Sequence, residues 1–274
     1  MNITKLIIPA AGIGSRFLPI TKSIPKEMLP LSNKPAIEYI VQEAFDAQIK
    51  NVGIILSPEK NVIKEYFQHN THLNQILAEK NQLFRVQSVN SLIDNINFSY
   101  YYQYNPAGLA DALMQAQHFI EPGEFFAVAL PDDIIFGQIP EILNLIHIAQ
   151  TMRGMVIAVQ EVPVEQISSY GVIAIKNQIN EHCYQIASLI EKPQAQDAPS
   201  NLAIVGRYIF HHDLFNFIPQ TQLTTSIEVL LPDTINLMIQ HGYPVFAYKI
   251  QGQRFDTGTP QGWINYMIHH NNLQ

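Results

Sequence analysis

The 274-residue sequence has one cysteine, Cys183, and no apolar run that approaches the ~18 residues of a membrane-spanning helix. A single cysteine excludes an intrachain disulfide framework and is compatible with a reducing compartment. The apolar residues that follow Lys5 are few and are interrupted by Pro9, which argues against a signal peptide. We therefore expect a cytoplasmic protein without a membrane segment.

Charged residues are also scarce, at 14% of the chain, and the 16 Lys and Arg are outnumbered by 23 Asp and Glu. The formal net charge of −7 argues against the broad basic face that sequence-independent nucleic-acid binding needs. A few local cations are still enough to bind a small anionic ligand. Hydrophobic residues make up 47% of the chain, so it can build a core and is not globally disordered.

Strand and helix patterns alternate over the first 162 residues. Apolar β-like runs are followed by segments whose apolar residues recur at helical spacing. We predict strands over 4–9, 51–57, 84–89, 98–103, 125–133 and 153–162, and helices over 36–47, 59–67, 71–82, 108–119 and 138–151. This order predicts a mainly parallel sheet covered by helices on both faces.

The pattern changes after residue 162. We predict three successive β-rich runs and a late strand at 170–176, 183–192, 201–210 and 244–250, with helices at 211–218, 226–241 and 261–270. The sequence has no Gly/Ser linker and no repeat of ~20–50 residues. The predicted fold class is therefore α/β, with a Rossmann-like mixed, mainly parallel sheet and a smaller β-rich subregion, in one domain over 1–274.

The glycine-bearing turn GIGSRF comes directly after the first strand. A dinucleotide fingerprint needs a third glycine where Phe17 stands, and a Walker P-loop needs four residues between its glycines rather than one. Gly12 and Gly14 permit close approach of the backbone to a ligand, and Arg16, Lys22 and Lys26 follow within fourteen residues of Gly12. We expect the prolines of this segment to hold it extended. Two interpretations remain open, a phosphate-binding loop and a surface loop with solvated charges.

Two later charged motifs are ambiguous in the same way. LPDD (130–133) ends a predicted strand, where aspartates are common as turn or helix-capping residues. EKP (191–193) is an ordinary charge pair ahead of a proline. From these residues alone, neither motif establishes a site.

The segment GIGSRFLPITKSIPKEMLPLSNKP (12–35) resembles the signature of the UTP–glucose-1-phosphate uridylyltransferases, in the sugar-phosphate nucleotidyltransferase superfamily. The similarity continues, in order along nearly the whole chain, in LPDD, YGVIAI (170–175), EKP, SNLAIVGRYIF (200–210) and FDTGTPQG (255–262). It implies the nucleotide-diphospho-sugar transferase type of fold, with 1–162 mainly binding the nucleotide and 163–274 mainly binding the sugar phosphate.

The resemblance implies attack of a sugar-1-phosphate oxygen on the α-phosphorus of UTP, which releases pyrophosphate. That nucleophile is already an anion, so the reaction needs alignment and charge neutralisation rather than a general base. By resemblance, Arg16 lies along the triphosphate and stabilises the departing pyrophosphate. Lys26 bridges the α-phosphate and the incoming sugar phosphate.

The resemblance also assigns the binding groups. The backbone at Ala10, Ala11, Gly12 and Gly14 meets the nucleotide, Gln103 reads the uracil edge, and Gly108 allows close approach to the base. Asp132 and Asp256 hold Mg²⁺, which prefers oxygen ligands. On the sugar-phosphate side, Glu191 accepts from sugar hydroxyls, Lys192 pairs with the phosphate, and Gly171 and Asn201 line the sugar.

The sequence departs from the family at the base and sugar pockets. The usual K-G-L-G-[HN]-A is AGLADA (107–112) here, so that Ala107 replaces the lysine and Ala110 the second glycine. DTGT (256–259) and AGLADA lean towards thymidylyltransferases, whereas PKEMLP favours UTP. The alternatives are dTTP or another sugar-1-phosphate as substrate, and a non-catalytic sugar-nucleotide sensor. The resemblance further implies a homo-oligomer, a dimer or tetramer. The acidic net charge and the short apolar runs predict no nucleic-acid or membrane partner.

Overall fold

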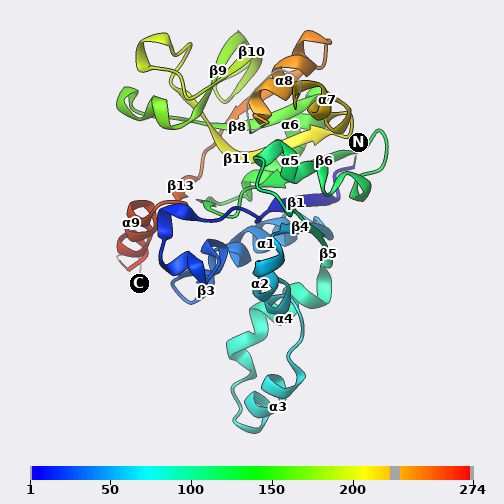
Figure 1. The fold of residues 1–274 in the computed structure, drawn as a ribbon, viewed down its shortest axis with the longest axis vertical. Coiled ribbons are helices and arrows are strands. Elements are labelled where there is room, and N and C mark those ends of the chain that lie inside the picture. The colour runs from blue at the N-terminus through cyan, green and yellow to red at the C-terminus, as the bar shows by residue number, and fades with distance from the viewer. Residues whose placement is uncertain (1, 223–228, 272–274) are drawn as a thin grey trace.

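The computed structural model describes residues 2–222 and 229–271. A mixed β-sheet forms its centre (Figure 1), and in these ranges nine strands pair in the order β5-β4-β1-β6-β11-β8-β12-β10-β9. The strands are β1 (Lys5–Pro9), β4 (Asn51–Leu56), β5 (Asn97–Tyr102), β6 (Phe125–Ala129), β8 (Met155–Glu161), β9 (Gly171–Gln178), β10 (Cys183–Glu191), β11 (Leu202–His211) and β12 (Val245–Lys249).

The strand directions confirm the predicted fold class. β5, β4, β1 and β6 are parallel to one another, and β12 is parallel to β8. β11 runs antiparallel between β6 and β8, and β10 runs antiparallel between β12 and β9. The sheet is therefore mixed, and within the described residues only β10 and β11 run opposite to the other seven strands. The β-rich subregion follows the change of pattern after residue 162.

Helices cover both faces of the sheet, as predicted. Leu6 and Ile8 of β1 belong to one buried cluster and Ile7 to another, because alternate side chains of a strand point to opposite faces. One face packs against α1 (Ala36–Asp46), α2 (Asn61–Tyr66), α4 (Gln87–Asn95), α6 (Glu141–Met152) and α9 (Pro260–Asn271). The other packs against α5 (Leu109–Met114), α7 (Leu214–Gln222) and α8 (Leu231–Gln240).

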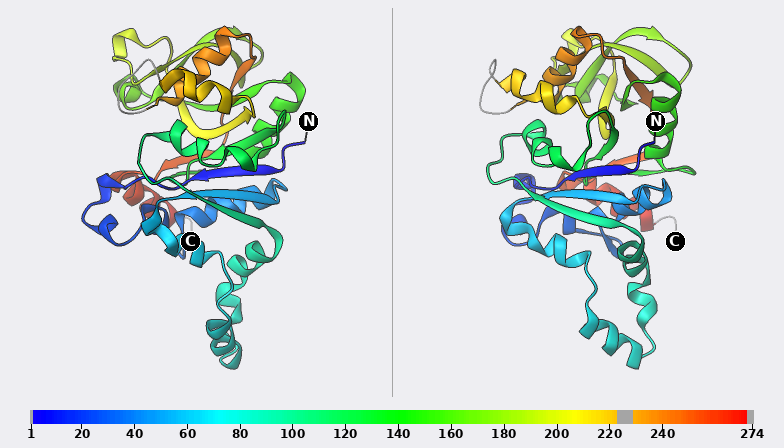
Figure 2. Two further views of the ribbon diagram at one scale, coloured as in Figure 1. Left: turned by 45° about the vertical axis from the view of Figure 1, so that its right-hand side comes forward. Right: turned by 90° about the vertical axis from the view of Figure 1, so that its right-hand side faces the viewer.

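The predicted strand FRVQSV (84–89) is wrong, because this segment is helical. Its residues form a 3₁₀ turn at Leu83–Val86 and then begin α4. With α3 (Thr71–Glu79) they make an arm that extends away from the sheet (Figures 1 and 2). Phe84 is 67% exposed there, so this apolar residue does not indicate a buried strand. Three apolar residues in a run of six fit the spacing of a strand and the spacing of a helix equally well.

Several predicted bounds also shift. β11 continues to His211 and α7 begins at Leu214, so the helix expected over 211–218 starts later. α8 begins at Leu231, whereas residues 226–228 of the helix predicted there lie outside the described ranges. None of the helices in the described part of the chain combines the length and apolar character that crossing a bilayer requires.

A small two-stranded ladder, which the sequence did not predict, brings the LPDD turn and Asp256 together. The expected strand over 125–133 ends at Ala129, and a new strand, β7 (Asp133–Phe136), follows a turn. β7 pairs antiparallel with β13 (Gln253–Asp256), in the register Asp133↔Asp256. Residues 253–254 had no predicted strand and 255–260 were expected as a turn. The pairing places the late aspartate beside the LPDD turn. A second ladder joins β2 (Pro30–Leu31) and β3 (Lys34–Pro35).

Candidate active site

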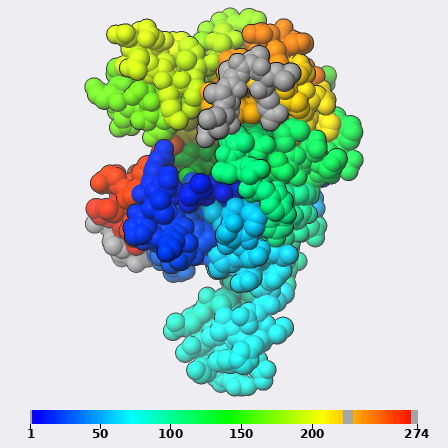
Figure 3. All heavy atoms as spheres, in the orientation of Figure 1, coloured from blue at the N-terminus to red at the C-terminus, as the bar shows by residue number. Residues whose placement is uncertain are grey.

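A cleft of about 880 Å³ opens where the loops that follow β1, β5 and β6 meet the β9–β10 region. In Figure 3 the surface is hollowed between the N-terminal loop and the upper part of the molecule. Seven residues expected at the site line the cleft: Arg16, Gly108, Asp132, Gly171, Glu191, Lys192 and Asp256. The expected residues outside its lining are Ala10, Ala11, Gly12, Gly14, Lys26, Gln103 and Asn201.

The loop after β1 is not the extended segment that its prolines suggested. It folds into three successive 3₁₀ turns, at Ser15–Phe17, Ile20–Lys22 and Lys26–Met28. Gly14 precedes the first of them with a φ of 71°, a conformation that favours glycine. The first of these turns places Arg16 at the cleft, and the third places Lys26 at the base of the loop.

A buried ion pair holds the inner side of this loop. Nζ of Lys60 donates to the carbonyls of Ala10 (2.7 Å) and Gly12 (2.6 Å) and to the carboxylate of Glu27 (2.8 Å). Burial lowers the pKa of Lys60, and burial raises the pKa of Glu27 despite the nearby lysine. In a trans peptide the N–H points opposite to the carbonyl. The amides that follow Ala10 and Gly12 are therefore directed away from Lys60, as a phosphate-binding backbone requires.

The base of the loop is tied to the end of β6 by a second ion pair. Nζ of Lys26 lies 2.5 Å from Oδ2 of Asp132. Burial lowers the pKa of Lys26, but the charges of Asp132 and Glu27 outweigh it and raise the pKa overall. Burial raises the pKa of Asp132, but Lys26 outweighs it and holds the pKa below its ordinary value. Both groups are therefore charged, with a cation directly beside the strand end.

The two candidate metal ligands converge beside Gly258. A Cβ on this glycine would lie 2.6 Å from Oδ2 of Asp132 and 3.1 Å from Oδ1 of Asp256. The glycine leaves open a space that two carboxylates face, which fits a divalent cation completed by phosphate and water oxygens. Within the described residues, no group of three or more His, Cys, Asp and Glu could hold a metal without such help.

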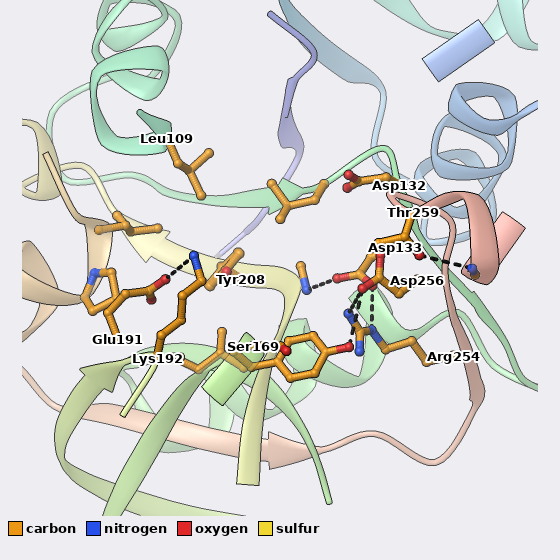
Figure 4. A pocket seen from close by; sticks show the side chains of 18 of the residues that line it. Leu109, Asp132, Asp133, Ser169, Glu191, Lys192, Tyr208, Arg254, Asp256 and Thr259 are labelled. Atoms are coloured by element: carbon orange, nitrogen blue, oxygen red, sulfur yellow. Dashed lines mark hydrogen bonds and ion pairs between the residues drawn. The ribbon is translucent and has the colours of Figure 1, made fainter. Parts of the chain in front are cut away.

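An arginine that sequence reasoning missed organises these carboxylates. Nε of Arg254 donates to Oδ1 of Asp133 (2.5 Å), whose Oδ2 accepts from the backbone N of Gly206 (2.7 Å). Nη2 of Arg254 lies 3.8 Å from Asp256 (Figure 4). The hydroxyl of Tyr170 donates to the same carboxylate at 3.4 Å. Asp133, interpreted from sequence as a turn residue, is therefore a structural anchor of the site. Burial, and next the charge of Asp133, raise the pKa of Asp256.

Glu191 and Lys192 lie across the cleft from the aspartates in Figure 4. Their charged groups are 3.3 Å apart, and the Lys192 side chain is 56% exposed. Lys192 has a φ of 44°, a strained backbone conformation for a lysine, and its N–H donates to the carbonyl of Tyr170 at 3.1 Å. A Cβ on Gly171 would lie 2.9 Å from Oε2 of Glu191, so the glycine makes room for that carboxylate.

Asn201 and Gln103 are two of the seven expected residues that lie outside the cleft lining. Asn201 is exposed ahead of β11, and its carbonyl accepts from Val162 N at 3.0 Å. Gln103 is buried, 6% exposed, and its Nε2 donates to the carbonyl of Gly108 and to Asp111. Gly108 lines the cleft, so Gln103 lies immediately behind its wall.

Sequence reasoning gave no role to Glu27, Lys60, Tyr170 or Arg254, nor to Asp111. Three of them stood inside quoted motifs, Glu27 in PKEMLP, Asp111 in AGLADA and Tyr170 in YGVIAI. Lys60 stands shortly after a buried strand, and ligands of parallel sheets bind at the carboxyl ends of the strands. Its position was therefore a weaker signal of a role in the site. Arg254 stands two residues before Asp256, and therefore on the same face of a strand that the sequence did not predict.

The fold and the cleft, with cations and carboxylates facing one space, are those of a nucleotidyltransferase. Residues 5–271 match the nucleotidyl transferase family model. Two similar curated relatives are named UTP–glucose-1-phosphate uridylyltransferase. The Mycoplasma pneumoniae enzyme is 39% identical over 96% of this chain and 90% of its own length, and the Bacillus subtilis enzyme is 38% identical over 96% and 89%. A crystal structure of UDP-glucose pyrophosphorylase complexed with UDP-glucose superposes with a TM-score of 0.90 at 33% identity, covering 100% of both chains. The chain belongs to the nucleotidyl transferase family and, within it, to the UTP–glucose-1-phosphate uridylyltransferases.

Proposed function

We propose that this chain transfers the uridylyl group of UTP to glucose-1-phosphate, giving UDP-glucose and pyrophosphate. The observation that carries the proposal is the arrangement of one cleft. Asp132 and Asp256 converge at one side of it, with Lys26 on Asp132, and the Glu191–Lys192 pair lies at the other side. The names of the similar curated proteins select the two substrates.

In this proposal the sugar phosphate attacks UTP directly. An oxygen of glucose-1-phosphate forms a bond to the α-phosphorus, and the bond from that phosphorus to the β-phosphate bridging oxygen breaks, so that pyrophosphate leaves with its electron pair. The nucleophile is already an anion and needs no base. The chain's contribution is to align two polyanions and to compensate their charge.

Three cations carry that compensation. Arg16 reaches the cleft from the first turn of the loop, where its planar guanidinium suits the β- and γ-phosphates. Lys26, held at Asp132, meets the α-phosphate from the side of the aspartates. Lys192, across the cleft, pairs with the sugar phosphate, so the two substrates are drawn together between the two lysines.

Asp132 and Asp256 would hold Mg²⁺ in the space beside Gly258. The ion, when bound, neutralises phosphate charge and polarises the reacting phosphoryl group. Arg254 and Tyr170 fix the carboxylate of Asp256, and the carbonyl of Asp132 accepts from Thr257 N at 2.7 Å. The two ligands are thereby oriented before any substrate binds.

The remaining assignments concern recognition. The backbone at Ala10, Ala11, Gly12 and Gly14 contacts the nucleotide, whose base meets Gly108 and Gln103. Glu191 accepts from sugar hydroxyls, and Gly171 and Asn201 line the sugar. We also propose that the chain acts in the cytoplasm as a homo-oligomer, which light scattering tests directly.

Pyrophosphate release over a grid of nucleotides and sugar-1-phosphates tests the function. The nucleotides are UTP, dTTP, CTP, ATP and GTP, and the sugars are the 1-phosphates of glucose, galactose and N-acetylglucosamine, all with MgCl₂. We expect the highest kcat/KM with UTP and glucose-1-phosphate. Absence of turnover with every pair would overturn the enzymatic proposal, and a preference for dTTP would overturn the uridylyl assignment.

A further inference from the structure

The side-chain amide of Gln103 is fixed in one orientation. Gln103 follows β5, and its backbone N donates to the carbonyl of Leu56 at 2.8 Å. Its Nε2 donates to Oδ2 of Asp111 at 2.7 Å and to the carbonyl of Gly108 at 3.2 Å. Both of these groups only accept hydrogen bonds. The nitrogen of the amide therefore has to face them, and the oxygen Oε1 has to face away.

Asp111 is the stronger of the two anchors. The carbonyl of Gly108 is shared, because it also accepts from the backbone N of Ala112 at 3.1 Å in the first turn of α5. The bond to the Asp111 carboxylate is shorter, and charge-assisted bonds of this kind are roughly twice as strong as neutral ones. Removing the carboxylate would leave one shared carbonyl to hold the amide.

The fixed amide lies beside the cleft. Gly108 and Leu109 line it, and the side chain of Leu109 points into it in Figure 4. With both Nε2 hydrogens taken by the chain, Oε1 is the polar atom that Gln103 can offer to a ligand. Gln103 can therefore accept a hydrogen bond from a ligand but cannot donate one.

We propose that Asp111 is a positioning residue that makes the site select a base with an N–H at position 3. Uracil presents such a donor at its Watson–Crick edge, whereas cytosine has an unprotonated acceptor there. An acceptor held against that edge binds uracil and repels cytosine. This inference rests on the proposed use of UTP and extends it by naming the residue that imposes the discrimination against CTP. It assigns no discrimination against dTTP, because thymine carries the same N–H.

The test uses Asp111→Asn, Gln103→Ala and the double variant. Asparagine has nearly the shape of aspartate but can donate as well as accept, so it no longer forces the orientation of the Gln103 amide. Titration calorimetry measures Kd for UTP, dTTP and CTP with each protein, and pyrophosphate release measures turnover separately. Asp94→Asn, a change of an exposed carboxylate on the arm, is the matched control.

We expect Asp111→Asn to lower the UTP-over-CTP preference about 10-fold, because the amide of Gln103 can then turn its donor towards the base. The UTP-over-dTTP ratio stays unchanged, which a general disturbance of the pocket would not guarantee. Because Asp111 acts through Gln103, the double variant has the same preference as Gln103→Ala alone.

An unchanged UTP-over-CTP ratio in Asp111→Asn would overturn the inference. The inference would also be overturned if Asp111→Asn lowered the UTP-over-CTP preference as much in the Gln103→Ala protein as in wild type. A wild type that binds UTP and CTP equally in calorimetry would overturn it as well. A wild type that prefers UTP in binding, loses that preference in Asp111→Asn and releases no pyrophosphate would overturn the proposed function and support the inference.

Discussion

Nζ of Lys26 lies 2.5 Å from Oδ2 of Asp132, although the two residues are 106 positions apart in the chain. The same oxygen faces the open space beside Gly258. The ion pair therefore joins the cationic N-terminal loop to the carboxylates at the end of the sheet. In our proposal it brings the cation that meets the phosphates and the carboxylate that holds the metal ion into one place before either ligand binds.

Asp132→Asn removes one of the two carboxylates that face Gly258. We expect kcat to fall by on the order of 10²-fold or more, as removal of preorganised charge at a reacting centre does. Pyrophosphate release at saturating UTP and glucose-1-phosphate measures the change. Asp197→Asn, at an exposed position, is the control. Equal rates in Asp132→Asn and the control would contradict the role of Asp132.

Arg16→Ala removes the guanidinium that the first turn of the loop carries to the cleft. We expect kcat to fall by on the order of 10²-fold or more, because the departing pyrophosphate loses its counter-charge. The same assay applies, with Arg85→Ala on the exposed arm as the control. A wild-type kcat in Arg16→Ala would refute the assignment.

Lys192→Ala tests the opposite side of the cleft. Because this lysine pairs with the sugar phosphate in our account, we expect the KM for glucose-1-phosphate to rise at least 10-fold while the KM for UTP changes little. Initial-rate kinetics with one substrate varied at a time separate the two effects. Lys176→Ala, at an exposed position of β9, is the matched control. The prediction is contradicted if both KM values and kcat remain unchanged.

Glu27→Gln tests the buried pair beneath the loop by its pH dependence. Burial raises the pKa of Glu27 in the folded protein above its ordinary value of 4.5. Its contribution to stability is therefore fully present below pH 4.5 and is lost as pH rises through the raised pKa. We expect the stability of wild type relative to Glu27→Gln to fall as pH rises from 4.5.

Urea unfolding at several pH values between 4.5 and 8 measures this difference, with Glu59→Gln as the control at a neighbouring exposed carboxyl. A difference that grows with pH over this range would mean that the pKa of Glu27 is lowered on folding, and would contradict the expectation.

The sequence predicted the parts of the fold that local patterns determine. The alternation of strand and helix over the first 162 residues predicted the parallel strands, because buried parallel strands have continuous apolar runs such as that of β4. The change of pattern predicted the β-rich part. FRVQSV failed because three apolar residues in six fit a strand and a helix equally well, and the arm gives them no sheet to join.

The parts of the site that the sequence did not predict depend on pairings between residues that are distant in the chain. The register Asp133↔Asp256 joins short strands about 120 residues apart, and neither strand has a distinctive pattern of its own. Lys60 and Arg254 are single charges in ordinary segments, and only the folded chain places one on the loop carbonyls and the other on Asp133. The motifs predicted residues that line the cleft, such as Arg16 and Asp132, and the folded structure added those that hold them in place.

Direct transfer of the uridylyl group is the central claim, and the fate of the α-phosphate tests it. Wild-type protein is mixed with [α-³²P]UTP, glucose-1-phosphate and MgCl₂, quenched in acid at intervals within one turnover, and separated into protein, UDP-glucose and UMP. The account predicts that the transferred label appears only in UDP-glucose and that none is bound to protein at any time. Label that first accumulates on the protein, or that is released as UMP, would contradict it.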